Sequence, residues 1–201
     1  IERIDCSVFK LISSALKKLG LKSVWFEERN LSYGEYQNIK EKVDRAAALV
    51  PTHSLTEDLR QIKSQEELKK IKKAVQITVN ALNFIKNFIL PEKKEIEIAA
   101  ELQHFIRYQG ASSAAFEIIV GSGANSSFPH HATSGKKLKN REPVLIDIGV
   151  DYQGYKSDLT RVFFLGKISN RFKKIYDIVL TAQHKAIKQI MGFFIRKIGI
   201  D

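Results

Sequence analysis

The fold of this chain is decided by the stretch Pro143-Val-Leu-Ile-Asp-Ile-Gly-Val-Asp-Tyr-Gln-Gly-Tyr-Lys-Ser-Asp-Leu-Thr-Arg-Val-Phe-Phe-Leu-Gly166. It contains two runs rich in β-branched and aromatic residues, separated by a polar stretch that holds a glycine. This pattern is typical of a β-hairpin. Each run carries one aspartate, Asp147 and Asp158, although aspartate is depleted in strands. The stretch therefore predicts a hairpin with two carboxylates that need an explanation.

The spacing of the two aspartates predicts how their side chains lie. A turn centred between Tyr152 and Gln153 places Asp147 and Asp158 directly opposite each other on one face of the hairpin. Opposed Cβ atoms are about 4.5–5.5 Å apart, and two negative charges that close repel unless a cation lies between them. Two metal ions about 3.5–4 Å apart suit such a pair. The alternative is a plain hairpin with two solvent-facing aspartates, and spacing alone leaves both interpretations open.

Two motifs, in the right order and at the right distance, resemble one protein family. The first is Ile146-Asp-Ile-Gly149 followed by Ser157-Asp-Leu-Thr-Arg161, which is similar to the first metal-binding hairpin of the aminopeptidase P and prolidase family. The second is the run from Phe116 to Ser134, which contains Pro129-His-His131 and resembles the substrate-side segment of the same family. These proteins are Xaa-Pro metallopeptidases, peptidase family M24, with the pita-bread (creatinase-type) fold. The resemblance extends from about Leu49 to Lys188.

The resemblance implies an α/β (α+β) fold in two parts. Residues 1–55 would be the C-terminal part of an N-terminal creatinase-like domain. Residues 56–201 would be the first half of a pita-bread metallopeptidase domain, so the chain would be truncated at both ends. The family builds this domain from two related halves around a curved antiparallel sheet. A single half is therefore expected to leave a sheet face and edge uncovered.

The resemblance also implies a reaction and a site. The family hydrolyses the peptide bond before proline with water activated by two divalent metal ions, usually manganese, with cobalt or zinc as alternatives. Asp147 would hold one ion and Asp158 would bridge both. His130 would bind the substrate or steady the developing oxyanion. His131 is assigned to the surface or the pocket rim.

The implied metal site is incomplete in this sequence. The family uses one His and two Glu ligands besides the two Asp, and these belong to strands beyond Asp201. Whether this chain is an enzyme therefore stays open, and the chain alone is expected to be inactive. The alternative function is a catalytically inactive module of the same fold that binds peptides or other proteins.

Composition limits the partners. The net charge of +11 is compatible with nucleic-acid binding, but the lysines are dispersed among glutamates and no nucleic-acid motif is present. No apolar run is long enough to span a bilayer. We therefore expect proline-containing peptides as partners, no nucleic acid and no membrane, with a homodimer as a further candidate. The single cysteine, Cys6, excludes an internal disulfide and indicates a reducing compartment, so a cytoplasmic location is expected.

Hydrophobic periodicity predicts the surrounding elements. Helices are expected over residues 6–19, capped by Asp5, over 32–43 with an extension towards Leu49, over 65–90 and 95–109, and from 170 onwards. Strands are expected over 23–26 and 116–120, and a linker over 55–64. The long helix before Pro91 is expected to bury Leu68, Ile71, Val75, Val79, Leu82, Ile85 and Ile89. The last helix is expected to bury Phe172, Ile175, Ile178, Val179, Ala182, Ala186 and Ile190. His104 and His184 are interpreted as structural, and Asn125 as a turn residue.

Overall fold

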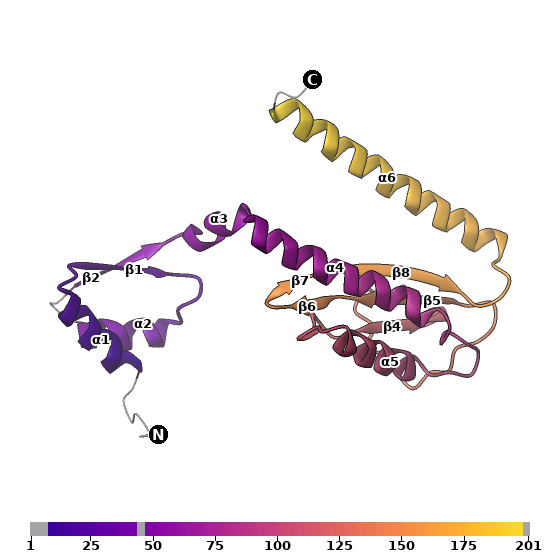
Figure 1. Ribbon diagram of the computed structural model, residues 1–201, viewed down its shortest axis with the longest axis horizontal. Helices are drawn as coiled ribbons and strands as arrows, with labels where there is room; N and C mark the ends of the chain where they lie inside the picture. Colours follow the sequence, from indigo (N-terminus) through magenta and orange to yellow (C-terminus); the bar gives the residue numbers. More distant parts are fainter. Residues whose placement is uncertain (1–7, 44–46, 199–201) are drawn as a thin grey trace. The chain divides into compact units, whose positions relative to one another are not determined.

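The computed structural model describes residues 8–43 and 47–198, and the chain divides into two units, one up to Ser64 and one from Gln65. Both units mix helices and strands, which confirms the predicted α/β class (Figure 1). The assignment of residues 1–55 and 56–201 to two parts of a known architecture stays a prediction. A predicted helix cap at Asp5 lies outside the described residues.

The first unit is a small helix–strand repeat. Its elements are α1 (Val8–Leu19), β1 (Ser23–Glu27), α2 (Tyr33–Val43), β2 (Ala48–Thr52) and α3 (Leu55–Gln61). The strands β1 and β2 form a two-stranded parallel sheet. A parallel pair needs a crossover connection, and α2 supplies it.

Two predictions for the first unit are partly wrong. The helix over 32–43 was expected to extend towards Leu49, but residues 48–52 form β2 instead. Pro51 is tolerated in that strand because β2 has only one neighbour, so a missing N–H can face away from the ladder. The predicted linker 55–64 contains the helix α3. The predicted start of α2 is confirmed, since Ser32 Oγ and the Glu35 side chain form a reciprocal cap.

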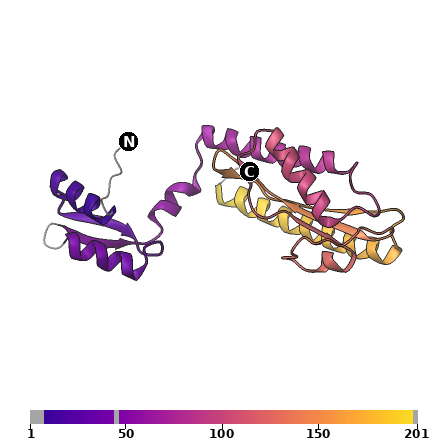
Figure 2. The same ribbon diagram turned by 90° about the horizontal axis from the view of Figure 1, so that it is seen from below.

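The second unit carries the predicted hairpin and its supporting helices. Its elements are α4 (Gln65–Ile85), α5 (Glu95–Tyr108), β3 (Ser113–Ala114), β4 (Ile119–Ser122), the 3-10 turn η1 (Gly123–Ser127), β5 (Pro143–Ile148), β6 (Val150–Tyr152), β7 (Tyr155–Lys156), β8 (Leu159–Phe164) and α6 (Asn170–Ile198). One antiparallel sheet has the order β4-β5-β8 and a smaller one the order β3-β6-β7. Helices α4 and α5 pack together and lie on the same side of the strands (Figure 2).

The core lies between these two helices and the sheets. Alternate residues of β5 point to the helices and are fully buried, and they form one cluster with the inward faces of α4 and α5. Its fully buried members include Ile77, Ile85, Ile98, Leu102, Ile106, Leu138, Val144, Ile146 and Ile148. Each such side chain stabilises the fold by about 1.5–3 kcal/mol relative to exposure. The opposite face of β5 carries Pro143, Leu145 and Asp147.

The buried stripe of α4 differs from the predicted one. Val75 and Val79 are 44% and 37% exposed, so their predicted burial is wrong. The stripe that packs on the strands includes Ala74 and Thr78 instead. The Thr78 hydroxyl lies 2.6 Å from the Ser157 hydroxyl, so a polar contact and a small alanine let α4 approach the hairpin closely. Periodicity alone could not choose between two overlapping apolar stripes.

The hairpin turn is centred one residue later than predicted, which shifts the strand pairing by two residues. Asp147 pairs with Thr160, and Tyr152 pairs with Tyr155, so the two-residue turn is Gln153–Gly154. Both turn residues have positive φ, 52° and 84°. A two-residue type I′ turn requires this, and glycine adopts it without cost. The expectation that Asp158 lies directly opposite Asp147 is therefore wrong, because the two aspartates are diagonal neighbours on one face.

At Gly149 the two arms of the hairpin lie very close together. A Cβ atom at this position would lie 2.3 Å from the Ser157 carbonyl oxygen and 2.6 Å from the Phe116 ring. No side chain fits in that space. Glycine therefore lets the backbone before Asp158 approach β5.

Helix α6 confirms the predicted helix but not its predicted burial. Its first turns contact the end of β8, with the Phe164 ring 6.2 Å from Phe172 and 6.4 Å from Tyr176. Beyond these turns it continues as a single rod (Figure 1). Residues of the predicted inner face, such as Ile178 and Val179, are about as exposed as its charged residues.

Candidate functional site

A pocket of about 460 Å³ lies on the face of the β4-β5-β8 sheet that points away from α4 and α5. The lining comes from β4 and the residues before it, from β5, from the loop after η1, and from the residue that precedes β8. Its members are Phe116, Glu117, Ile119, His130, His131, Ala132, Asp147 and Asp158. The pocket therefore brings together the three predicted site residues Asp147, Asp158 and His130.

Asp147 reaches the pocket because of strand alternation. Its neighbours Ile146 and Ile148 are fully buried against the helices, so the aspartate between them points to the opposite face. Thr160, its cross-strand partner, donates a hydrogen bond from Oγ1 to Asp147 Oδ1 at 2.6 Å. The threonine orients the carboxylate and leaves its other oxygen for a ligand. Thr160 was part of the recognised motif, but sequence reasoning gave it no role.

Asp158 is placed by the residue before it. Ser157 is buried, and its hydroxyl accepts a hydrogen bond from the Val150 amide at 3.1 Å and pairs with the Thr78 hydroxyl. These contacts fix the backbone to β6 and α4, so the next side chain points to the pocket. Asp158 itself is exposed, and within the described residues its carboxylate accepts no hydrogen bond.

The two histidines of the loop differ in their surroundings. His130 is exposed and lines the pocket together with both aspartates. His131 lines the same pocket but is only 14% exposed, and its Nε2 lies 3.0 Å from Glu95 Oε2. His131 is therefore part of the pocket wall and is bound to the protein behind it.

Glu95 is the residue that sequence reasoning missed. It is fully buried at the first turn of α5 and accepts hydrogen bonds from Ser122, Asn125, His131 and Ser134. Burial raises its pKa, but the hydrogen bonds from Ser134, His131 and Ser122 outweigh this and lower the pKa to about 2. The carboxylate is thus an ionised anchor for the loop that carries His130. Nothing in the sequence marked it, since acidic residues are ordinary in a first helical turn.

The donor atoms at the pocket suit a hard divalent cation in part. Carboxylate oxygens are preferred by manganese and magnesium, whereas imidazole also suits zinc and cobalt. Across residues 8–43 and 47–198, however, no three His, Cys, Asp or Glu side chains come close enough together to hold a metal ion. The pocket therefore holds the two predicted aspartates, and their role as metal ligands stays a prediction.

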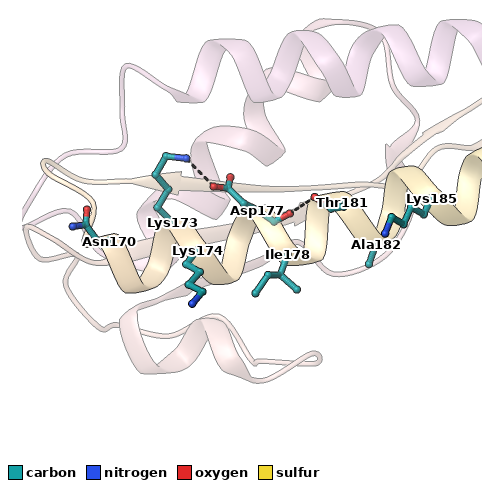
Figure 3. A pocket seen from close by; sticks show the side chains of 8 residues that line it. All are labelled: Asn170, Lys173, Lys174, Asp177, Ile178, Thr181, Ala182 and Lys185. Atoms are coloured by element: carbon teal, nitrogen blue, oxygen red, sulfur yellow. Dashed lines mark hydrogen bonds and ion pairs between the residues drawn. The ribbon is translucent and has the colours of Figure 1, made fainter.

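The remaining histidines lie outside the pocket. The His104 ring packs edge-on against Tyr108, with centroids 4.7 Å apart, and His184 is exposed on α6. Another hollow, of about 670 Å³, is lined by eight side chains that all come from α6 (Figure 3). Because it has no wall from another element, it is the surface of one helix rather than a binding site. In the described part of the chain, no helix is long and apolar enough to cross a membrane.

Comparison with known proteins agrees with this geometry. The sequence model of metallopeptidase family M24 matches residues 69–196, which include most of α4, all of α5, both sheets of the second unit and most of α6. The chain belongs to metallopeptidase family M24. The two aspartates and His130 of this M24 chain all lie within the matched region.

Individual relatives of this M24 chain are Xaa-Pro peptidases. An Xaa-Pro dipeptidase from Pyrococcus horikoshii is 36% identical over 186 residues, which cover 92% of this chain and 52% of that protein. The solved structure of an Xaa-Pro dipeptidase from Bacillus anthracis is 41% identical and superposes with a TM-score of 0.84, covering 89% of this chain and 50% of that one. The crystal structure of an X-Pro aminopeptidase from Thermotoga maritima is 30% identical and superposes with a TM-score of 0.85, covering 93% of this chain and 53% of that one.

These structures confirm the predicted pita-bread class. The chain spans about half the length of the relatives it matches.

Proposed function

We propose that this chain takes part in hydrolysis of the peptide bond before proline, as the first half of an Xaa-Pro peptidase domain. One observation carries the proposal: Asp147, Asp158 and His130 line a single pocket in a chain of family M24. The substrate class follows from the relatives, which are Xaa-Pro dipeptidases and an X-Pro aminopeptidase.

In this proposal Asp147 and Asp158 hold divalent metal, with manganese as the expected ion and two ions as the expected number. When bound, such ions lower the pKa of a water molecule to near neutrality and polarise a carbonyl group. Thr160 keeps the Asp147 carboxylate in one orientation through its 2.6 Å hydrogen bond. Ser157, held by α4, fixes the backbone that presents Asp158.

His130 has a separate role in the proposal. It is exposed on the loop anchored by Glu95 and lines the pocket with the aspartates. From that position it would bind the substrate or donate a hydrogen bond to the oxygen that gains charge during the reaction. A donor of this kind typically contributes about 10²–10³-fold to the rate.

The second candidate function is a binding module without catalysis. It is favoured by the lining of the pocket, because among the described residues no three His, Cys, Asp or Glu side chains lie close enough together to hold a metal ion. In that case the pocket would bind peptides without hydrolysing them. A cytoplasmic location and a homodimer remain proposals under either function.

Reconstitution separates the two functions. The chain is mixed with the separately produced second half of a relative's catalytic domain and assayed on Ala-Pro with excess Mn²⁺. The enzyme function predicts turnover in the mixture and none with the chain alone. Turnover should vanish in Asp158→Asn and persist in the control Asp177→Asn, which lies on α6 outside the pocket. A mixture that forms a complex without turnover would favour the binding module.

A further inference from the structure

The contact between His131 and Glu95 fixes which ring nitrogen of the histidine donates a hydrogen bond. Glu95 is fully buried and ionised, and an ionised carboxylate can only accept hydrogen bonds. His131 Nε2, at 3.0 Å, must therefore be the donor. In a neutral imidazole with a protonated Nε2, the other nitrogen, Nδ1, carries a lone pair and no proton.

The ring cannot easily turn away from this arrangement. Glu95 also accepts hydrogen bonds from the backbone and side chain of Ser122 at 2.8 Å each, from Asn125 at 3.0 Å, and from the side chain of Ser134 at 2.6 Å. A carboxylate held by that many donors stays in place and so holds the imidazole that donates to it. Carboxylates behind functional histidines orient the ring and fix its tautomer in the same way.

The free nitrogen of His131 faces accessible space. Within residues 8–43 and 47–198 every fully buried side-chain nitrogen or oxygen has a hydrogen-bond partner. His131 Nδ1 makes no hydrogen bond there, so this nitrogen is not buried. The His131 side chain is 14% exposed and lines the pocket, so we infer that the accessible nitrogen faces the pocket. The pocket therefore contains an unused hydrogen-bond acceptor.

The charge of the pocket indicates what this acceptor binds. Its wall includes three carboxylates, Glu117, Asp147 and Asp158, and no lysine or arginine, in a chain whose net charge is +11. Such a pocket attracts cationic groups. His131 is not part of a metal-binding cluster among the described residues. A protonated amine is also a cation, and unlike a metal ion it donates hydrogen bonds.

We propose that His131 is a second functional histidine of this pocket, and that its Nδ1 accepts a hydrogen bond from the α-ammonium group of a bound peptide. Glu95 is then a positioning residue that acts through His131. The inference rests on the proposed function and deepens it. In an Xaa-Pro dipeptide the bond nitrogen is tertiary and has no hydrogen, so the α-ammonium is the only backbone N–H donor. An acceptor in the pocket has no other backbone group to recognise.

The first test needs neither metal nor peptide. The full chain is labelled with ¹⁵N-histidine, and ring nitrogens are observed by NMR above the ordinary titration range of imidazole. We expect His131 to have a protonated Nε2 and an unprotonated Nδ1. His53 is the internal contrast, because its Nδ1 contacts Glu28 at 2.9 Å on an exposed surface. A His131 ring that carries its proton on Nδ1 would overturn the inference.

The second test measures amine recognition without metal. Ala-Pro, Ala-Ala and N-acetyl-Ala-Pro are titrated into the labelled chain at millimolar concentrations. We expect the two free amines to move the His131 Nδ1 resonance and the acetylated peptide to leave it in place. The His104 resonances, which lie outside the pocket, should not move. Equal effects of Ala-Pro and its acetylated form, or no effect of any peptide, would overturn the inference.

Variants separate recognition from folding. His131→Leu should weaken Ala-Pro binding about tenfold, since a hydrogen bond to a charged group is lost, while binding of the acetylated peptide stays unchanged. If His131→Leu does not fold, Glu95→Gln keeps the ring and should loosen its tautomer and weaken Ala-Pro binding in the same direction. Unchanged affinity in a folded variant would contradict the inference.

Failure of the proposed function can be told apart from failure of the inference about His131. If Ala-Ala and Ala-Pro move the Nδ1 resonance equally, amine recognition holds and no preference for proline is present at this half of the site. If the reconstituted mixture shows no turnover, the metal-free NMR result still decides the role of His131.

Discussion

Glu95 and the pair Asp147 and Asp158 are acidic sites of the same unit, yet the protein surrounds them very differently. Glu95 is fully buried and accepts hydrogen bonds from four residues. Asp147 accepts one, from Thr160, and in the described part of the chain Asp158 accepts none. A carboxylate whose lone pairs are filled by the protein acts as an internal anchor. One whose lone pairs open on a pocket is available to a cation from outside.

The largest effect is expected from removing the anchor. Glu95→Ala leaves several buried donors without an acceptor, so we expect a loss of about 3–5 kcal/mol in the free energy of unfolding. Urea unfolding followed by circular dichroism measures it, because the single tryptophan, Trp25, lies in the first unit and does not report on the second. The matched control is Glu101→Ala on the same helix, expected within about 0.5 kcal/mol of the parent. A Glu95→Ala chain as stable as this control would remove the distinction between the two sites.

Lowering the pH should reduce the contribution of Glu95 to the free energy of unfolding by a similar amount. The pKa of Glu95 is lowered from 4.5 to about 2 in the folded chain, so its contribution is fully present above pH 4.5 and is lost as pH falls towards 2. A difference of this size corresponds to about 3 kcal/mol. In Glu95→Gln the loss of stability over this window should be shallower, because about one proton fewer is taken up on unfolding. Identical pH profiles for the two chains would mean that the carboxylate is not stabilised by its donors.

A smaller change in stability, with a clear change in metal affinity, is expected at Asp147. Thr160→Val removes the hydrogen bond to its carboxylate, so we expect a loss of about 0.5–1.5 kcal/mol in stability. The affinity for Mn²⁺, measured by electron paramagnetic resonance of the free ion, should fall about tenfold or more. Thr181→Val is the control, since this threonine bonds only to the α6 backbone. Unchanged Mn²⁺ affinity would argue that Asp147 needs no orienting partner.

The smallest change in stability is expected at Asp158. Because its carboxylate is exposed, Asp158→Asn should lie within about 0.5 kcal/mol of the parent without divalent metal. Added Mn²⁺ should raise the melting temperature of the parent by mass action and leave the variant unaffected. Thermal unfolding with and without Mn²⁺ checks both statements. Equal metal stabilisation of parent and variant would place the metal elsewhere.

The sequence predicted the hairpin and its two aspartates, but not their register. The strands follow from two apolar runs, and the shared pocket follows from strand alternation. The register depends on which two residues form the turn. Gly154 indicates the correct turn, because glycine readily adopts the positive φ that its second position requires. The predicted turn, centred one residue earlier, also places both aspartates on one face, so the expectation of a shared face did not depend on the exact pairing.

Other features could not be predicted from the chain alone. The role of Glu95 depends on four partners up to 39 residues away, which no local pattern reveals. Helices α4 and α6 show a similar limit. Both are amphipathic, but α4 buries a stripe against the strands while α6 exposes most of its apolar residues between Phe172 and Ile190. Periodicity predicts that a helix has an apolar face; it does not say whether this chain provides something to cover it.

Two glycines of the hairpin have different consequences for the sequence variation that the fold tolerates. Gly154 has positive φ and open space around its Cα, so asparagine or aspartate, which enter this backbone region at little cost, should be accepted there. At Gly149 the obstacle is the Ser157 carbonyl itself, which no change of rotamer can move. In a library of all single substitutions selected for folding, position 154 should return a short list of survivors and position 149 only the parent.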